Sequence, residues 1–226
     1  MATVEDVVKS LREKAKPGAL NGMAQFGMET DGRLGVSVPD MRKISKALGK
    51  DHDLAVELWK TGVAEAKIVA AMIDEPEKVT EAQMEEWVGG INSWDVCDQV
   101  CMNLFEKTSF VFKKIHEWSD RPEEFVKRMA YSLIACIAWH DKEAEDNTFI
   151  DLFPVIKKGA TDQRNFVKKA VNWALRNIGK RNTRLNSAAI RLAIEIRQLD
   201  SKAARWIASD ALRELRSEAV KKRLLD

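Results

Sequence analysis

At 226 residues the chain is long enough to bury one hydrophobic core or one short array of helical repeats. Its 45% hydrophobic and 32% charged residues exclude an intrinsically disordered protein, and no apolar run approaches the roughly 20 residues that a membrane span needs. The net charge of +2 hides an asymmetry: residues 157–226 hold 18 Lys and Arg against 7 Asp and Glu, whereas residues 1–156 hold 19 against 28. This balance suits the carboxyl-terminal part to a polyanion, although solvated helix faces of mixed sign would give the same counts.

The amino-terminal residues MATVEDVVKS are acidic where a secretory signal is basic and then apolar. They predict a cytoplasmic protein, associated with the nucleoid if it is bacterial. Three cysteines, in a chain where no export signal is expected, do not predict a disulfide framework.

Most segments space their apolar residues as amphipathic helices do. The glycine- and valine-rich stretch 31–38 is predicted to be a loop, and Pro39 stands where a first-turn proline stands. Thr80 and Gln83 fit a capping box, and Pro122 is the next first-turn proline in the pattern.

The last two predicted helices cover residues 181–199 and 203–224, where Leu, Ile, Val and Ala recur at spacings of three and four. No long linker or low-complexity segment interrupts the chain. The pattern predicts an all-α protein with a single domain over residues 1–226.

A repeat is present in the second half. The sequence FVKR that ends at Arg128 returns 41 residues later as the FVKK that ends at Lys169. A period of this length is typical of HEAT or armadillo helix pairs, which stack into solenoids with a concave binding face. We therefore expect Arg128 and Lys169 to project from equivalent positions and to begin a basic ridge.

Two stretches carry residues suited to chemistry. Trp94 and Asp98 are four residues apart, one turn along a helix that Ser93 can cap. An indole offers a π-face to a cation and a carboxylate offers its charge. Taken alone, this spacing favours the plainer alternative, in which Trp94 is a core residue and Asp98 makes an ion pair.

The second stretch surrounds Trp173, which has Lys169 four residues before it and Arg176 three residues after it, with Lys180 beyond. Aromatic residues interleaved with cations suit a surface that meets the sugars, bases and phosphates of DNA. A core tryptophan in an amphipathic helix is an equally good interpretation. Neither zinc-ligand pairs, a phosphate-binding glycine loop nor a nucleophile elbow occurs in the sequence.

Together these residues resemble the AlkD family of DNA alkylation repair glycosylases. The resemblance extends over nearly the whole chain, in the family's order and close to its spacing. The matching stretches are Glu57-Leu58-Trp59, Ser93-Trp94-Asp95 with Asp98, FVKR at residues 125–128, and Lys169-Ala170 leading to Trp173 and Leu175-Arg176.

The resemblance implies a curved α-solenoid of antiparallel HEAT-like or armadillo-like helix pairs whose concave face holds duplex DNA. It implies a monomeric, monofunctional glycosylase that excises cationic N3- and N7-alkylated purines without metal or cofactor, and without drawing the lesion into a base-binding pocket. The family's catalytic trio corresponds to Trp94, Asp98 and Trp173, and its arginine beside the lesion corresponds to Arg128.

The remaining DNA contacts that we expect are phosphate contacts from Lys169, Arg176 and Lys180. The sequence departs from the family pattern at Ser93, where the family has a second tryptophan, and at Phe26, where it has a tyrosine. Two alternatives remain: an architectural HEAT-like DNA-binding protein without catalysis, and a protein–protein scaffold. Asp98 opposes the first, because a carboxylate that faces phosphates weakens binding, and a basic face that carries tryptophans opposes the second.

Overall fold

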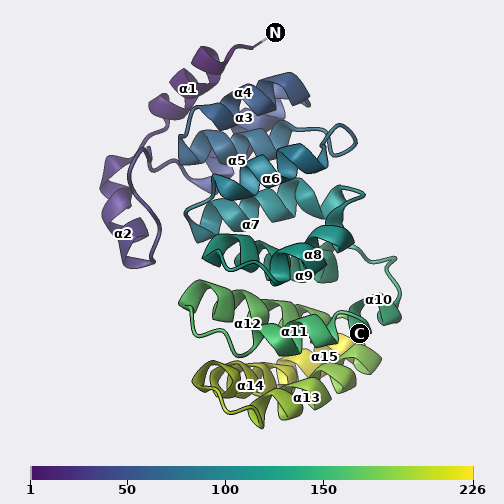
Figure 1. Cartoon of the computed structure of the whole chain (residues 1–226). Helices are drawn as coiled ribbons and strands as arrows, with labels where there is room; N and C mark the ends of the chain where they lie inside the picture. Colours follow the sequence, from purple (N-terminus) through teal and green to yellow (C-terminus); the bar gives the residue numbers. More distant parts are fainter. Residues whose placement is uncertain (1, 226) are drawn as a thin grey trace. The chain divides into compact units, whose positions relative to one another are not determined.

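The computed structural model describes residues 2–225 of the chain. Within that range the regular elements are helices and no strand occurs (Figure 1), which confirms the all-α prediction. The chain divides into two compact units, Met1–Val111 and Phe112–Asp226. The assignment of residues 1–226 to one domain stays a prediction.

The first unit consists of short helices in which α5 packs against α3, α4 and α7. Its buried aromatic core includes Trp59 and Trp87, whose rings stack with centroids 4.2 Å apart. Its elements are α1 (Val4–Glu13), η1 (Pro17–Ala19), α2 (Leu20–Gln25), α3 (Val38–Leu48), α4 (His52–Lys60), α5 (Ala64–Ile73), α6 (Glu81–Gly89), α7 (Trp94–Asn103) and η2 (Phe105–Lys107).

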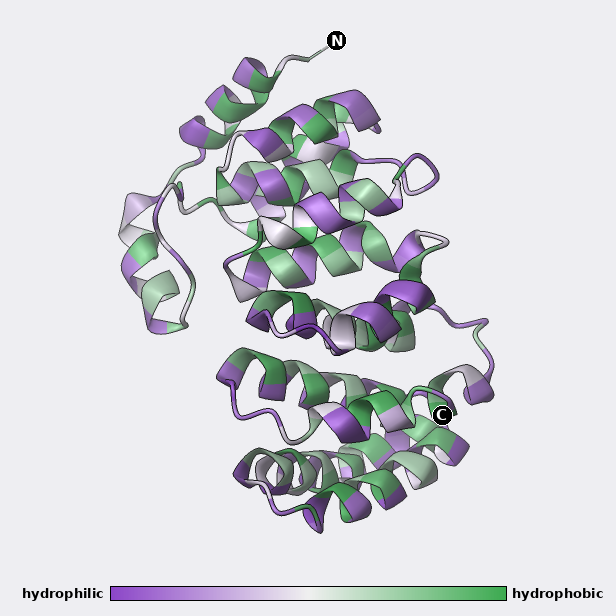
Figure 2. Cartoon of the chain, viewed as in Figure 1, coloured by the Kyte–Doolittle hydropathy of each residue, from purple (hydrophilic) through white to green (hydrophobic). Residues whose placement is uncertain are grey.

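The second unit has longer helices arranged in rows. The helix α12 packs against α9 on one side and α14 on the other, while α13 packs against α11, α12 and α14 (Figure 1). Its elements are α8 (Val111–Ser119), α9 (Glu124–His140), α10 (Asp146–Ile150), α11 (Phe153–Gly159), α12 (Asn165–Gly179), α13 (Thr183–Arg197), α14 (Lys202–Leu215) and α15 (Glu218–Leu225). Green apolar and purple polar residues alternate along these helices in Figure 2, as the helical period of the sequence requires.

The repeat found in the sequence is a repeat of the structure. Phe125 at the start of α9 and Phe166 at the start of α12 stack with ring centroids 5.5 Å apart. The sequence spacing between α12 and α14 is similar. The Asn172 amide of α12 donates to Asp210 Oδ2 of α14 at 2.7 Å, and these two residues are 38 positions apart. Equivalent residues of successive helices therefore meet, as in stacked helical repeats.

Helix starts follow the predicted signals only in part. Pro39 lies in the first turn of α3, as expected. The Thr80 hydroxyl accepts the Gln83 backbone N–H at 3.1 Å, but the Gln83 amide donates to Asp74 at 2.7 Å, so only half of the capping box forms. Pro122 precedes α9 rather than entering its first turn.

The carboxyl-terminal helices differ from the prediction in one respect. The segment predicted over 181–199 is α13, whose N-cap Asn182 accepts the Leu185 N–H at 2.8 Å. The segment predicted as one helix over 203–224 is broken into α14 and α15. Ser217 between them accepts the Val220 N–H at 3.3 Å, so a new helix begins where the apolar spacing alone predicts continuation.

Candidate functional site

Trp94 is the first residue of α7 and is half-buried. Its indole N–H donates to the backbone carbonyl of Phe26, just after α2, at 3.0 Å. A ring whose N–H is held in this way keeps one orientation while part of its surface remains accessible. Asp98 follows one turn later on α7 and is also half-buried, so the predicted helical pairing of indole and carboxylate has the expected local structure.

A buried ion pair that the sequence pattern does not predict lies beside Trp94. The Arg33 guanidinium binds both oxygens of Asp95, with Nη2–Oδ1 at 2.6 Å and Nη1–Oδ2 at 2.8 Å. The side chains of Arg33 and Asp95 are only 2% and 17% exposed. Ser93 accepts from Arg33 at 3.1 Å and donates to Asp95 at 2.6 Å. The departure from the family pattern at Ser93 therefore places a hydroxyl inside a buried polar network.

The loop that carries Arg33 is fixed at a second point by Glu65 of α5. The fully buried Glu65 carboxylate accepts the backbone N–H groups of Leu34 at 3.1 Å, Gly35 at 2.7 Å and Val36 at 3.3 Å. Gly35 has φ +76°, and a Cβ there would lie 2.4 Å from the Lys16 carbonyl oxygen, so a side chain is excluded. The predicted loop is thus fixed at two points, by Glu65 of α5 and by Asp95 next to Trp94.

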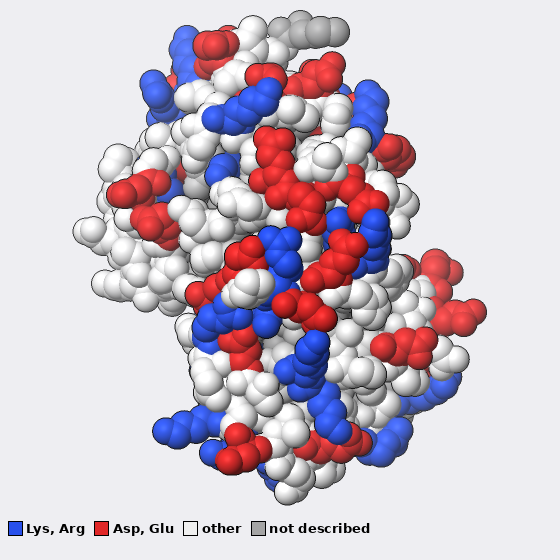
Figure 3. Space-filling view, viewed as in Figure 1, with Lys and Arg blue, Asp and Glu red and all other residues white. Residues whose placement is uncertain are grey.

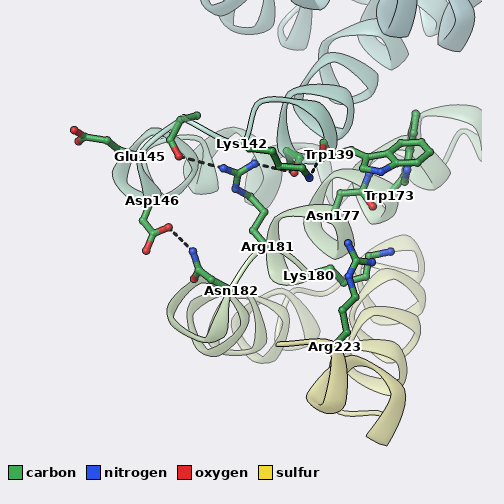
Figure 4. Close-up of a pocket in the computed structure, with 12 residues that line it drawn as sticks. Trp139, Lys142, Glu145, Asp146, Trp173, Asn177, Lys180, Arg181, Asn182 and Arg223 are labelled. Atoms are coloured by element: carbon green, nitrogen blue, oxygen red, sulfur yellow. Dashed lines mark hydrogen bonds between the residues drawn. The ribbon is translucent and has the colours of Figure 1, made fainter. Parts of the chain in front are cut away.

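Trp173 belongs to the other unit, on α12, and is half-buried. It lines a pocket of about 610 Å³ together with Trp139, Asn177 and Lys180 (Figure 4). The three residues proposed as catalytic are therefore distributed over both units, with Trp94 and Asp98 in Met1–Val111 and Trp173 in Phe112–Asp226.

Arg176 and Lys180 are engaged by acidic residues of α14. Lys180 Nζ binds Glu214 Oε1 at 2.8 Å, Arg176 binds Glu214 Oε2, and Asp210 Oδ2 lies 3.6 Å from the Arg176 guanidinium. Burial opposes the ionisation of Glu214, but the Lys180 hydrogen bond and the two positive charges outweigh it and lower the pKa of that carboxyl. A phosphate that binds these cations must compete with a carboxylate.

Lys169 and Arg128 occupy equivalent positions in the repeat but differ in their surroundings. Lys169 is exposed, and within residues 2–225 it makes no hydrogen bond or ion pair. Arg128 is 5% exposed and donates to the Phe166 carbonyl at 2.7 Å, which joins α9 to α12. The expectation that both side chains project as a basic ridge is therefore wrong for Arg128, because its guanidinium is buried and bonds across the helix stack. Contacts of either residue with DNA stay predictions.

Part of the positive charge of residues 157–226 is paired with carboxylates. Lys158 binds Asp120 at 2.6 Å, Lys157 binds Glu195 at 2.8 Å, and Arg184 lies 3.6 Å from Asp146. Blue and red side chains are accordingly interspersed over the face shown in Figure 3. Asp120 and Asp146, which precede residues 157–226 in the chain, thus offset part of the excess of cations in that segment.

The part of the chain that the structure describes contains no group of three or more His, Cys, Asp and Glu side chains placed to hold a metal ion. Cys97, Cys101 and Cys136 are buried and reduced. Over the same residues, none of the helices has the length and apolar character that crossing a membrane requires.

Among solved structures, the chain is similar to one described as a new family of proteins related to the HEAT-like repeat DNA glycosylases with affinity for branched DNA structures. The match has 19% sequence identity and a TM-score of 0.76, and it covers 94% of this chain and 95% of that chain. It shows that the fold is that of the HEAT-like repeat proteins, which confirms the predicted repeat class.

An engineered protein (14% identity, 96% of this chain and 99% of that chain, TM-score 0.42) and a designed armadillo repeat protein (16% identity, 92% and 98%, TM-score 0.38) match too weakly to support an argument. A search of the curated proteins gives no match. The model of the family described as DNA alkylation repair enzyme matches residues 7–215, nearly the full length. The chain therefore belongs to the DNA alkylation repair enzyme family.

Proposed function

We propose that this protein is a DNA glycosylase that hydrolyses the N-glycosidic bond of cationic N3- and N7-alkylated purines in duplex DNA. The observation that carries the proposal is the start of α7, where the indole of Trp94 and the carboxylate of Asp98 lie one turn apart and both remain partly accessible. The membership in the DNA alkylation repair enzyme family supports it.

The chemistry needs little from the protein because the alkylated base is already a good leaving group. As the C1′–N bond breaks, its electron pair goes to the purine nitrogen and cancels the ring's positive charge, while positive charge grows on the deoxyribose. Water adds its oxygen to C1′, and its proton is released. Asp98 would stabilise the oxocarbenium-like sugar and orient the water. Trp94 and Trp173 would each add cation–π attraction of about 0.5–2 kcal/mol.

The contacts that fix the loop of residues 27–37 support this role for Trp94. Stabilisation of a transition state is largest when the stabilising groups are fixed before the reaction. Here the Trp94 N–H bond to Phe26 fixes the ring, and the Arg33–Asp95 pair together with Glu65 fixes the segment that leads away from Phe26. The indole is thus held directly by a backbone carbonyl, and buried charged groups hold the loop that follows this carbonyl.

Phosphate contacts are proposed chiefly for Lys169, which is exposed and carries no ion pair within the described chain. Arg176 and Lys180 would exchange Glu214 for phosphate on binding. Arg128 would act from a buried position, by holding α9 and α12 in register. We expect a monomer to bind the duplex.

The test is incubation of the protein with methylated duplex DNA, with release of 7-methylguanine and 3-methyladenine measured under single-turnover conditions. We expect Asp98→Asn to slow release by about 100-fold, the loss of one preorganised electrostatic partner, while duplex affinity holds or rises. Asp200→Asn is the matched control, because Asp200 is fully exposed and loses the same charge. Release by Asp98→Asn at the parent rate would show that Asp98 is structural.

A second function is favoured by the similar structure with affinity for branched DNA and by Ser93, which replaces an aromatic residue of the family pattern. In this alternative the chain is a HEAT-like DNA-binding protein without catalysis. Duplex or branched DNA binding with no release of methylated bases by the parent would establish it.

A further inference from the structure

The pocket in the unit Phe112–Asp226 extends well beyond Trp173. It lies where α9 and α12 end, and its wall continues through the loop after α9 to Arg223 of α15. Its volume of about 610 Å³ falls in the range of sites that hold small organic ligands. Figure 4 shows Trp139 and Trp173 at one end, Glu145 and Asp146 at the other, and Arg223 reaching in from the last helix.

The aromatic end exposes a surface that proteins usually bury. Trp139 is 49% exposed, although it is among the largest apolar side chains of the unit. One side of its ring packs against His140, with centroids 5.0 Å apart and planes within 20°. An indole that is supported on one side and open on the other is suited to stack on a flat ring.

Three cations line the same pocket near the two indoles. Arg223 is exposed and makes no hydrogen bond or ion pair with the described residues. Lys180 forms an ion pair with Glu214, and Lys142 donates a hydrogen bond to the Trp139 carbonyl. Arg181, by contrast, serves the fold, because it donates to the Ala138 carbonyl at 3.0 Å and caps the end of α9.

These features specify a ligand with a flat aromatic ring and a negative charge close to it. A nucleotide has both, but in a duplex its base is stacked between the neighbouring bases and has no free face. The base of an unpaired nucleotide can present one face to an indole. An acidic peptide would meet the cations, but its carboxylates would leave the indole faces uncovered.

We propose that this pocket binds an unpaired nucleotide of a single-stranded stretch of DNA, with its base on Trp139 and its phosphate beside Arg223. The proposal rests on the proposed function only in that DNA is the partner; the pocket is assigned to a single strand, not to the alkylated base. Stacking of one base on an aromatic side chain corresponds to roughly 5- to 150-fold in affinity.

The experiment measures binding of the full-length protein to two fluorescein-labelled strands, each about 12 nucleotides long, by fluorescence anisotropy. One strand is oligothymidylate, and the other is a deoxyribose-phosphate chain of the same length without bases. We expect the parent to prefer the strand with bases and Trp139→Ala to lose that preference, while its affinity for the abasic strand is unchanged. Trp139→Phe should keep most of the preference, because a smaller ring still stacks.

The matched control is Trp206→Ala, because Trp206 is 40% exposed in the same unit and lies outside the pocket. It should bind both strands as the parent does. Arg223→Ala should weaken both strands and reduce the slope of log affinity against log salt by about 0.7. Its control is Arg191→Ala, an exposed arginine of α13.

The proposal is overturned if the parent binds both strands equally, or if Trp139→Ala and Trp206→Ala have the same effect. Binding of polyglutamate at Arg223, without any preference for bases, would likewise overturn it in favour of an acidic peptide. The proposed function fails separately: methylated duplex would then be bound without base release, whatever the preference for bases. If neither strand nor any duplex binds, DNA is not the partner and both proposals fall.

Discussion

Replacing Glu214 by Gln removes the carboxylate that holds two predicted phosphate contacts. Oε1 binds Lys180 at 2.8 Å and Oε2 binds Arg176, while Asp210 remains 3.6 Å from Arg176. Glutamine keeps the size of the side chain and one acceptor oxygen but carries no charge. We expect Glu214→Gln to bind duplex DNA more tightly, because phosphates no longer compete with a carboxylate for these cations.

The magnitude follows from the exposure of the pairs. The side chains of Arg176, Lys180 and Glu214 are 22–28% exposed, so water partly screens their attraction. Each pair is then worth about 0.5–1 kcal/mol. Releasing both corresponds to a dissociation constant roughly 5- to 30-fold lower. The slope of log affinity against log salt should also steepen by about 0.9 for each phosphate that a released cation newly neutralises.

The assay is anisotropy of a fluorescein-labelled duplex titrated at several salt concentrations between about 50 and 200 mM. Glu218→Gln is the matched control, since Glu218 pairs with Lys221 at 2.7 Å on exposed α15 and loses the same charge. If both variants raise the affinity equally, only the net charge acts. That result would refute the placement of Arg176 and Lys180 at the DNA backbone.

The remaining predictions concern stability. Arg33→Met should lower the free energy of unfolding by about 3 kcal/mol in urea denaturation, because the carboxylate it pairs with stays partly buried without its partner; a loss below about 1 kcal/mol, as for a surface pair, would contradict this. Glu214, whose pKa is lowered in the folded protein, contributes stability that is present above its unfolded pKa of about 4.3 and is lost as pH falls through the folded value. Urea denaturation across that acid range should show a smaller pH dependence for Glu214→Gln than for the parent. Gly159→Ala should cost about 1–3 kcal/mol, since its Cβ would lie 2.1 Å from a buried tyrosine hydroxyl, whereas Gly89→Ala, with open space around it, should be neutral or stabilising.

The sequence alone determined the helical class, the repeat and the local pairing at the start of α7. Helical period and capping depend on neighbours a few residues away, so they are readable without the tertiary structure. The 41-residue echo predicted that Phe125 and Phe166 are equivalent, and their rings do stack. Trp94 and Asp98 lie on one helix, as their spacing predicts. The family resemblance rested on the same local stretches.

Only the tertiary structure decided which charged side chains are exposed and unpaired, and so able to meet a ligand. The repeat makes Arg128 and Lys169 look alike, yet one is buried against the Phe166 carbonyl and the other is exposed. Arg176 and Lys180 meet Glu214 because α12 packs on α14, and Arg33 meets Asp95 across 62 residues of chain. Whether a charge faces solvent, a carbonyl or a carboxylate depends on the packing of helices remote in sequence, and no periodicity within one helix encodes it.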